Sequence, residues 1–306
     1  MLNSTKIFES KEQARKFVES CEKDFESSLA ETVRLVCENK GIRLIGLSGP
    51  TCSGKTTTAK KLISYLTSMG KNVHVVSIDD FYLDRAVLIK RADDDPNIEI
   101  DYDSEDTIDF EALKACVAEV FTDEPTKIPK YDFVEGRRTG YITIDPDEND
   151  LFIFEGIQAI YPKITALFRQ YNYKSLYICV ESAINMEGTI FEPNELRLMR
   201  RLVRDYNFRG SSPEFTYYLW DSVRANEDVS IFPYASGCDY FINSTLPFEV
   251  NLLAPYLRKI LPLVPSDNEH KTDAETLLKK IDGIEEVSPE YLIEDSLCYE
   301  FIERKI

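Results

Sequence analysis

Histidine and paired cysteines are scarce in this chain of 306 residues. Only His74 and His270 occur, which are too few for a histidine-rich metal centre. The seven cysteines are scattered and form no Cys-x-x-Cys pair, so we expect neither a zinc site nor a disulfide framework. Unpaired cysteines in this number fit a reducing compartment, and we expect a cytoplasmic protein.

The chain also lacks long apolar runs and an excess of positive charge. No stretch approaches the roughly 18 consecutive apolar residues of a membrane span, and the first ten residues have no apolar signal core. The 36 Lys and Arg residues face 54 Asp and Glu residues, a formal net charge of -18. Such a surface disfavours a nucleic-acid coat, although a local basic patch can bind a small phosphate compound. We therefore expect no membrane and no nucleic-acid partner.

The alternation of apolar and amphipathic segments predicts an α/β protein. Short apolar runs of the kind found in buried strands are separated by segments with helical periodicity. This order predicts a doubly wound, mostly parallel sheet with helices on both faces. Strands are expected at 42–47, 73–78, 151–154, 176–180 and 240–243, and helices at 56–67, 110–121, 195–206 and 250–261. The Asp-rich residues 92–109 are expected to form a loop.

The chain divides into three regions. Residues 1–40 are expected to be a helical extension, with an amphipathic helix over 9–38, and residues 41–264 the main domain. Polar residues 265–272 lead into a tail that ends at residue 306. The apolar side chains of this tail predict packing either on the domain or on another subunit, and the pattern does not decide between them.

Residues 49–56 carry the strongest functional signal. They read Gly-Pro-Thr-Cys-Ser-Gly-Lys-Thr and match G-x-x-x-x-G-K-[ST] between a predicted strand and a predicted helix. In such a loop the backbone N–H groups face phosphate oxygens, the lysine reaches the β and γ phosphates, and the threonine ligates Mg²⁺. We therefore expect ATP and Mg²⁺ here. The expected nucleotide-binding residues are Gly49, Thr51, Cys52, Ser53, Gly54, Lys55, Thr56 and Thr57.

Acidic residues follow two of the predicted strands. Asp79 and Asp80 come after the second strand, and Glu155 ends the third. Ligands gather at the carboxyl ends of parallel strands. One of the two aspartates can therefore accept a hydroxyl proton during phosphoryl transfer, and Glu155 can hold Mg²⁺ directly or through water. The alternative is that these acids only cap or solvate turns.

Five arginines lie within thirteen residues of the helix expected at 195–206 and its end. Their mutual repulsion requires a polyanion or carboxylates opposite, so they predict a lid over ATP. The alternative is a solvated face paired with acids such as Glu195 and Asp205. Gly210 is either a lid hinge or a helix cap. The arginines are Arg197, Arg200, Arg201, Arg204 and Arg209.

Six segments in order resemble the uridine kinase / phosphoribulokinase family of P-loop kinases, and most closely a bacterial uridine-kinase-related subgroup. The resemblance covers roughly residues 40–262. The segments are GPTCSGKTT (49–57), SIDDFYLDR (77–85), DYDSEDTIDF (101–110), IPKYDFVEGRR (128–138), FEGIQAIY (154–161) and RLMRRLVRDYNFRG (197–210).

The resemblance implies a role for each matching residue. Asp79 corresponds to the catalytic base, with Lys55 and Arg204 stabilising the transferred group, and Thr56, Asp79 and Glu155 form the magnesium site. Asp103 corresponds to the acid that binds ribose hydroxyls. The other implied acceptor-binding residues are Tyr82, Tyr131, Phe133, Arg138, Arg201 and Arg209.

Three positions depart from the family pattern. Gly136 stands where a histidine reads the pyrimidine, Ser211 replaces an arginine, and Leu219 replaces a glutamine. Because polar readers give most of the discrimination of a site, the resemblance supports the kinase chemistry better than pyrimidine specificity. We expect an ATP-dependent kinase, first of a nucleoside 5′-hydroxyl. The alternatives are another small alcohol, such as a sugar, a sugar phosphate or a pantothenate-like compound, and a non-catalytic nucleotide-binding regulator. A homo-oligomer also fits the resemblance.

Overall fold

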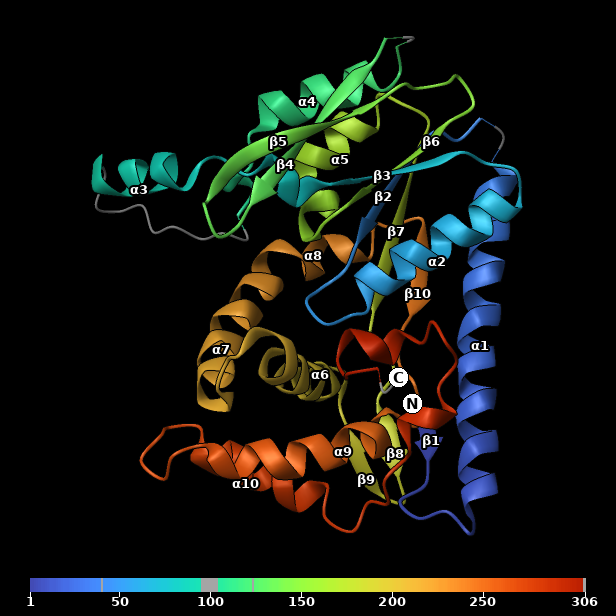
Figure 1. The fold of residues 1–306 in the computed structure, drawn as a ribbon, viewed down its shortest axis with the longest axis vertical. Helices are drawn as coiled ribbons and strands as arrows, with labels where there is room; N and C mark the ends of the chain where they lie inside the picture. The colour runs from blue at the N-terminus through green and yellow to red at the C-terminus, as the bar shows by residue number, and fades with distance from the viewer. Residues whose placement is uncertain (40, 95–103, 123, 305–306) are drawn as a thin grey trace.

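A five-stranded parallel sheet forms the centre of the molecule (Figure 1). The computed structural model describes residues 1–39, 41–94, 104–122 and 124–304. The strand order is β10-β7-β2-β6-β3, and every pairing in this sheet is parallel. The predicted doubly wound sheet is therefore confirmed. Its strands are β2 (Leu44–Ser48), β3 (Val73–Ser77), β6 (Leu151–Glu155), β7 (Tyr173–Cys179) and β10 (Tyr240–Asn243).

Helices cover both faces of this sheet because successive strand residues point to opposite sides. Leu44 belongs to the core shared with helices α4 and α5, whereas Ile45 and Leu47 belong to the core shared with α1, α2, α6 and α9. Both faces are apolar, as a buried parallel sheet requires. The helices are α1 (Lys11–Glu38), α2 (Lys55–Ser68), α4 (Phe110–Glu119), α5 (Pro162–Phe168), α6 (Pro193–Arg209) and α9 (Glu249–Ile260).

Several elements lie outside the predicted set. An antiparallel hairpin of β4 (Thr126–Asp132) and β5 (Arg137–Ile144) projects beside α4. Strand β1 (Leu2–Ser4) pairs with β8 (Ile184–Met186), which also pairs with β9 (Thr189–Phe191). Helix α3 (Arg85–Asp94) extends into the segment predicted as a loop, and a short turn covers Glu105–Thr107. The further helices are α7 (Pro213–Ser230), α8 (Phe232–Ala235) and α10 (Lys271–Lys280).

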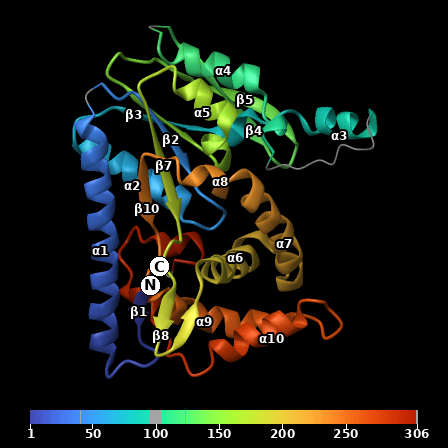
Figure 2. The same ribbon diagram turned by 180° about the vertical axis from the view of Figure 1, so that it is seen from behind.

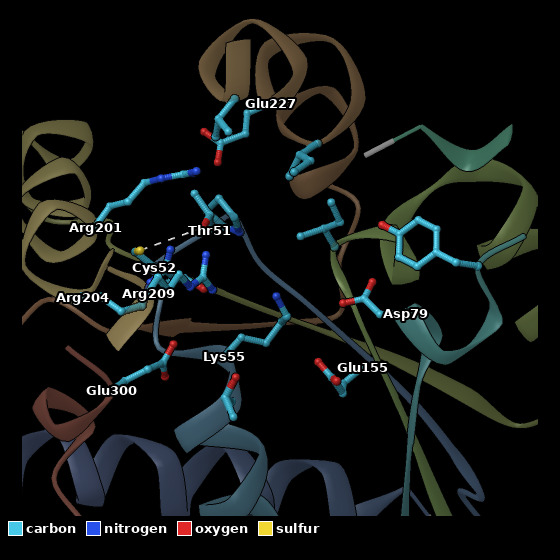
Figure 3. Close-up of a pocket in the computed structure, with 17 residues that line it drawn as sticks. Thr51, Cys52, Lys55, Asp79, Glu155, Arg201, Arg204, Arg209, Glu227 and Glu300 are labelled. Carbon is cyan, nitrogen blue, oxygen red and sulfur yellow. Dashed lines mark hydrogen bonds between the residues drawn. The ribbon is translucent and has the colours of Figure 1, made fainter. Parts of the chain in front are cut away.

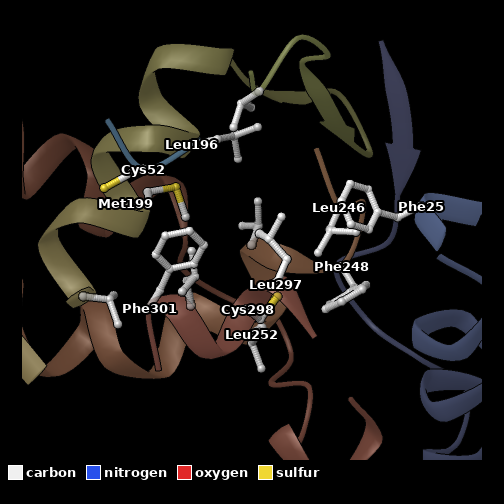
Figure 4. Packing of buried hydrophobic residues seen from close by; sticks show 14 of the residues in the cluster. Phe25, Cys52, Leu196, Met199, Leu246, Phe248, Leu252, Leu297, Cys298 and Phe301 are labelled. Atoms are coloured by element: carbon white, nitrogen blue, oxygen red, sulfur yellow. The ribbon is translucent and has the colours of Figure 1, made fainter. Parts of the chain in front are cut away.

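The first residues and the C-terminal tail both pack on the domain (Figures 1 and 2): β1 pairs with β8, and the Glu285 N–H donates to the Lys6 carbonyl. Helix α1 runs along one side of the molecule. The tail is buried in the same core: Leu297, Cys298 and Phe301 lie among Met199 and Leu252 (Figure 4). Of the two predicted positions for the tail, the structure shows packing on its own chain. Within the described ranges, no helix has the length and apolarity that crossing a membrane requires.

Candidate active site

Residues 49–56, called the phosphate loop below, lead from β2 into α2. Steric contacts and backbone angles require glycine at two of its positions. A Cβ atom on Gly49 would stand 2.2 Å from the main-chain oxygen of Ile178. Gly54 has φ +88° and precedes the first residue of α2, a left-handed conformation that favours glycine. Cys52 has φ 58° without being glycine. The loop therefore holds a strained turn at the positive end of a helix, which is a site for an anion.

A cavity of about 390 Å³ opens over this loop (Figure 3). It brings together three groups that the sequence predicted separately: the loop, the acids at the strand ends and the cations of the arginine-rich helix. The predicted residues in its lining are Thr51, Cys52, Ser53, Lys55, Thr56, Asp79, Tyr82, Glu155, Arg201, Arg204 and Arg209. Of the other predicted phosphate-loop residues, Gly49, Gly54 and Thr57 are not part of the lining.

The strand register places Glu155 and Asp79 at the same edge of the sheet. Ser77 at the end of β3 pairs in register with Glu155 at the end of β6, and its hydroxyl donates a 2.7 Å hydrogen bond to Glu155. Asp79 follows in the short turn Ile78–Phe81 and lines the cavity. Asp80 is buried elsewhere, since it accepts hydrogen bonds from Lys130 at 2.5 Å and the Tyr131 N–H at 3.0 Å. Of the two aspartates, Asp79 is therefore the one that lines the cavity.

Gln158 is a site residue that the sequence analysis did not single out. Its side-chain amide donates hydrogen bonds to Asp79 Oδ1 at 3.2 Å and to the Tyr82 hydroxyl at 3.0 Å. The side chain is fully buried, so its position is fixed by packing. The signal was available in the family segment 154–161, but nothing local in the sequence links position 158 to position 79.

An aromatic cluster lies beside Asp79. The rings of Tyr82, Tyr131 and Phe133 have centroids 5.2–6.0 Å apart, and Phe133 is 59% exposed. Arg138 is not part of the cavity lining: its guanidinium donates to the Phe81 carbonyl at 3.2 Å and pairs with Asp109 at 2.9 Å. Its placement is that of a brace for the hairpin. The predicted ribose-binding acid, Asp103, lies outside the described residues.

The place of the missing histidine is filled by another side chain. Gly136 has φ +68°, and a Cβ atom there would stand 2.8 Å from Arg85 Cβ and Nε. Arg85 also donates hydrogen bonds to the carbonyl oxygens of Phe133 and Val134. Position 136 is thus a turn glycine in contact with the side chain of Arg85.

Three of the five arginines line the cavity. Arg201, Arg204 and Arg209 all lie near the buried carboxylate of Asp205, with N–O distances of 3.3, 2.7 and 3.5 Å. Glu300 also lies within electrostatic reach of Arg204, but two carboxylates do not neutralise three cations. Burial, followed by the charge of Arg204, lowers the pKa of Arg209. The cluster therefore favours an additional anion such as a phosphate group. Gly210 caps α6 in the left-handed conformation.

The other two arginines have a different role from the predicted lid or solvated face. Arg197 and Arg200 are 1% exposed and form buried ion pairs with Glu227 and Glu249. Each also donates to the phosphate loop: Arg197 to the Thr51 carbonyl at 2.9 Å and Arg200 to the Cys52 carbonyl at 3.1 Å. The solvated-face alternative is wrong for this pair.

The residues predicted to hold Mg²⁺ fit that ion. Among the described residues no group of three His, Cys, Asp or Glu side chains could form a protein-only metal site. Mg²⁺ is commonly held by one or two carboxylates together with substrate phosphates and water. The Thr56 hydroxyl and the carboxylates of Asp79 and Glu155 line one cavity, which provides that sparse oxygen set.

A comparison with known families agrees with this geometry. Residues 44–247 match the phosphoribulokinase / uridine kinase family. The chain belongs to this family. The matched range contains the phosphate loop, the hairpin, Asp79, Glu155 and all five arginines of α6, but not Glu300, which also lines the cavity.

The individual relatives share less than a third of their residues with this chain. The chain is 29% identical over 181 residues to a uridine-cytidine kinase C of Dictyostelium discoideum, covering 59% of this chain and 34% of that protein. It is 28% identical to a uridine kinase of Staphylococcus aureus, covering 66% of this chain and 88% of that protein. This chain therefore spans about a third of the first relative. Among solved structures, it is similar to a putative fructose transport system kinase from Silicibacter, with 21% identity, a TM-score of 0.48, and coverage of 70% and 98%.

Proposed function

We propose that this protein is an ATP-dependent kinase that transfers the γ-phosphoryl group to a hydroxyl of a small molecule. The observation that carries the proposal is the shared cavity of Asp79, Lys55 and the arginines of α6 (Figure 3). Asp79, which can act as a general base, lies on one wall of the cavity, and the arginine side chains of α6 lie on the other. Phosphoryl transfer to an alcohol needs a base for the acceptor hydroxyl and positive charge around the transferred phosphoryl group.

The residues divide the work as follows. Asp79, oriented by Gln158, accepts the proton of the acceptor hydroxyl. Lys55 and the cavity arginines, Arg204 foremost, stabilise the charge that develops on the transferred group. Thr56 and Glu155, with Asp79, would hold Mg²⁺, which when bound neutralises phosphate charge.

For the acceptor, we propose a nucleoside 5′-hydroxyl first, as in uridine or cytidine. The relatives named uridine kinase support it, and the rings of Tyr82, Tyr131 and Phe133 offer stacking surface for a base. Asp103 is proposed as the ribose-binding residue. Arg138 is proposed to act indirectly, through the hairpin that carries Tyr131 and Phe133.

A second acceptor class is favoured by one observation. Arg85 occupies the place above Gly136, where the family pattern has a base-reading histidine. A cation at this point suits an acceptor that carries a carboxylate or phosphate group, such as a sugar phosphate or a pantothenate-like compound. A non-catalytic regulator is a third reading, which turnover with any acceptor would exclude. The expected homo-oligomer and cytoplasmic location stay predictions.

The deciding experiment is an acceptor panel with ATP and Mg²⁺, followed by ADP release. Uridine, cytidine, other nucleosides, ribulose 5-phosphate, pantothenate, glycerate and plain sugars are compared. Asp79→Asn is the control, and loss of a general base is expected to lower kcat by about 10²–10⁴-fold. Turnover with uridine or cytidine supports the first acceptor, and turnover only with an anionic alcohol supports the second. ATP binding without turnover on any acceptor would contradict the kinase proposal.

A further inference from the structure

The C-terminal tail reaches the phosphate loop. The short turn Leu297–Glu300 places Glu300 in the wall of the cavity (Figure 3). Its carboxylate oxygen accepts hydrogen bonds from the backbone N–H of Thr57 at 3.4 Å and from the Thr57 hydroxyl at 3.2 Å. Leu297 covers the open side of Gly54, where a Cβ atom would stand 2.3 Å from it.

The group that Glu300 contacts is one that a nucleotide needs. Helix α2 begins at Lys55, so the Thr57 N–H belongs to the first turn and has no partner within the helix. Such N–H groups, at the positive end of the helix, hold the phosphates in a P-loop. The lysine side chain serves the β and γ phosphates. In this structure Glu300 lies against the N–H of Thr57, two residues further along; with Glu300 moved aside, this N–H would face the phosphate next to the nucleoside.

We propose that Glu300 is a side-chain gate of the nucleotide site: its carboxylate occupies the subsite of the α-phosphate and must move aside when a nucleotide binds. This inference rests on the proposed function, because it takes a nucleoside triphosphate as the donor. The gate lowers the affinity for nucleotide, since each binding event has to break the contacts of Glu300 with Thr57. It also supplies a negative charge to Arg204, which lies within electrostatic reach of Glu300.

Only the side chain of Glu300 moves, because the tail around it is firmly packed. Leu297, Cys298, Phe301 and Ile302 are each at most 3% exposed. The Arg200 guanidinium lies 5.1 Å from the centre of the Phe301 ring, and Asn207 donates to the Phe301 carbonyl at 3.3 Å. Exposing these four buried side chains would cost free energy of the same order as the whole that binding of a nucleotide with micromolar affinity supplies. Glu300 itself is partly exposed and is free to change rotamer.

The test is the dissociation constant of ADP, measured by calorimetry on the full chain. Glu300→Gln keeps the shape and one acceptor oxygen but removes the charge, so we expect ADP to bind about tenfold more tightly, as for the loss of one charge-assisted hydrogen bond. Glu303→Gln is the matched control: it removes an exposed charge three residues away, and its affinity should equal that of the wild type. Affinity that is unchanged or weaker in Glu300→Gln would overturn the gate.

A second measurement tests the packed tail. Hydrogen exchange of residues 297–302 should stay as slow in the ADP-saturated wild type as in the free protein. Faster exchange would mean that the whole tail leaves, and the gate would be overturned. Equal ADP affinity in the wild type, Glu300→Gln and Glu303→Gln would contradict the gate but not the kinase proposal. No binding of ADP or ATP by any of them would overturn the donor assignment and the gate together.

Discussion

Arg200 donates a hydrogen bond to the main-chain oxygen of Cys52 at 3.1 Å while its guanidinium is paired with the buried Glu249. A phosphate loop points its N–H groups at the bound phosphate. Its carbonyl oxygens therefore point toward the rest of the protein and need hydrogen-bond donors there. Arg200, together with Arg197 on Thr51, supplies them from α6. The same helix carries Arg201 and Arg204 into the cavity, so its cations are held in a fixed position relative to the loop.

Replacing Arg200 by lysine tests this brace. Lysine keeps the charge beside Glu249 but lacks the planar fork that reaches several acceptors at once. We expect the KM for ATP to rise about tenfold, the equivalent of about 1.4 kcal/mol for one hydrogen bond, in protein that remains folded. Arg224→Lys is the control, because Arg224 pairs with Glu227 and Asp228, which lie on α7 outside the phosphate loop. An unchanged KM in folded Arg200→Lys protein would argue against a positioning role.

Gln158 is expected to act on kcat and not on ATP binding. Gln158→Leu removes the hydrogen bonds to Asp79 and Tyr82 while it keeps a buried side chain of similar size. Misorientation of the base should lower kcat by about tenfold, a fraction of the full general-base contribution, with the KM for ATP unchanged. Steady-state kinetics measure both.

The control for this variant is Gln170→Leu, which changes an exposed glutamine. A higher KM for ATP with an unchanged kcat in Gln158→Leu would show that Gln158 supports nucleotide binding and does not orient Asp79.

The parts of the site that could be predicted are those with short-range signals. The phosphate loop and Asp79 are each encoded in a few consecutive residues next to an apolar strand, and the parallel sheet brings them together. Gln158, Glu300 and the brace by Arg200 could not be predicted in this way. Each depends on a contact across 79, 243 or 148 positions of the chain, and no local pattern specifies which distant backbone atom a side chain reaches.

The sequence pattern did not predict the hairpin of β4 and β5, for a different reason. Strand β5 (Arg137–Ile144) has no buried residue, and its first four residues, Arg-Arg-Thr-Gly, include no large apolar side chain. Too little of it shows the alternation of apolar and polar residues that marks a half-buried strand. Strand β4 contains Pro129, which also weakens a strand signal. The tail posed an open choice in the sequence because its apolar residues specify burial but not the surface against which they pack.

Glu22 is expected to make stability depend on pH. It is fully buried on α1, and burial raises its pKa from 4.5 to about 7, opposed by Ser296 and Lys61. The folded state therefore keeps a proton that the unfolded state releases, so the stabilisation is complete below about pH 4.5 and is lost as the pH rises through 7. Glu22→Gln should remove this loss, which amounts to at most about 3 kcal/mol at pH 8.

Urea unfolding at pH 5 and pH 8 measures the effect. The difference in unfolding free energy between the two pH values should be smaller in Glu22→Gln than in the wild type. Glu19→Gln, an exposed position on the same helix, should behave like the wild type. Equal pH dependence in Glu22→Gln and the wild type would mean that Glu22 does not carry the effect.

Gly49→Ala is expected to abolish the nucleotide site through a clash with the backbone. The added Cβ atom would stand 2.2 Å from the Ile178 carbonyl oxygen, which belongs to a central strand and has little freedom to move. Relief therefore requires the phosphate loop to shift, at a cost of about 1–3 kcal/mol in overpacking and with misaligned N–H groups. We expect ADP affinity to fall by more than about 100-fold, as for two or more lost hydrogen bonds to phosphate.

Gly140→Ala, where the added atom meets nothing within 4 Å, should bind ADP like the wild type. Normal ADP binding by Gly49→Ala would show that the loop adjusts without loss, and the steric account of its first glycine would then be wrong.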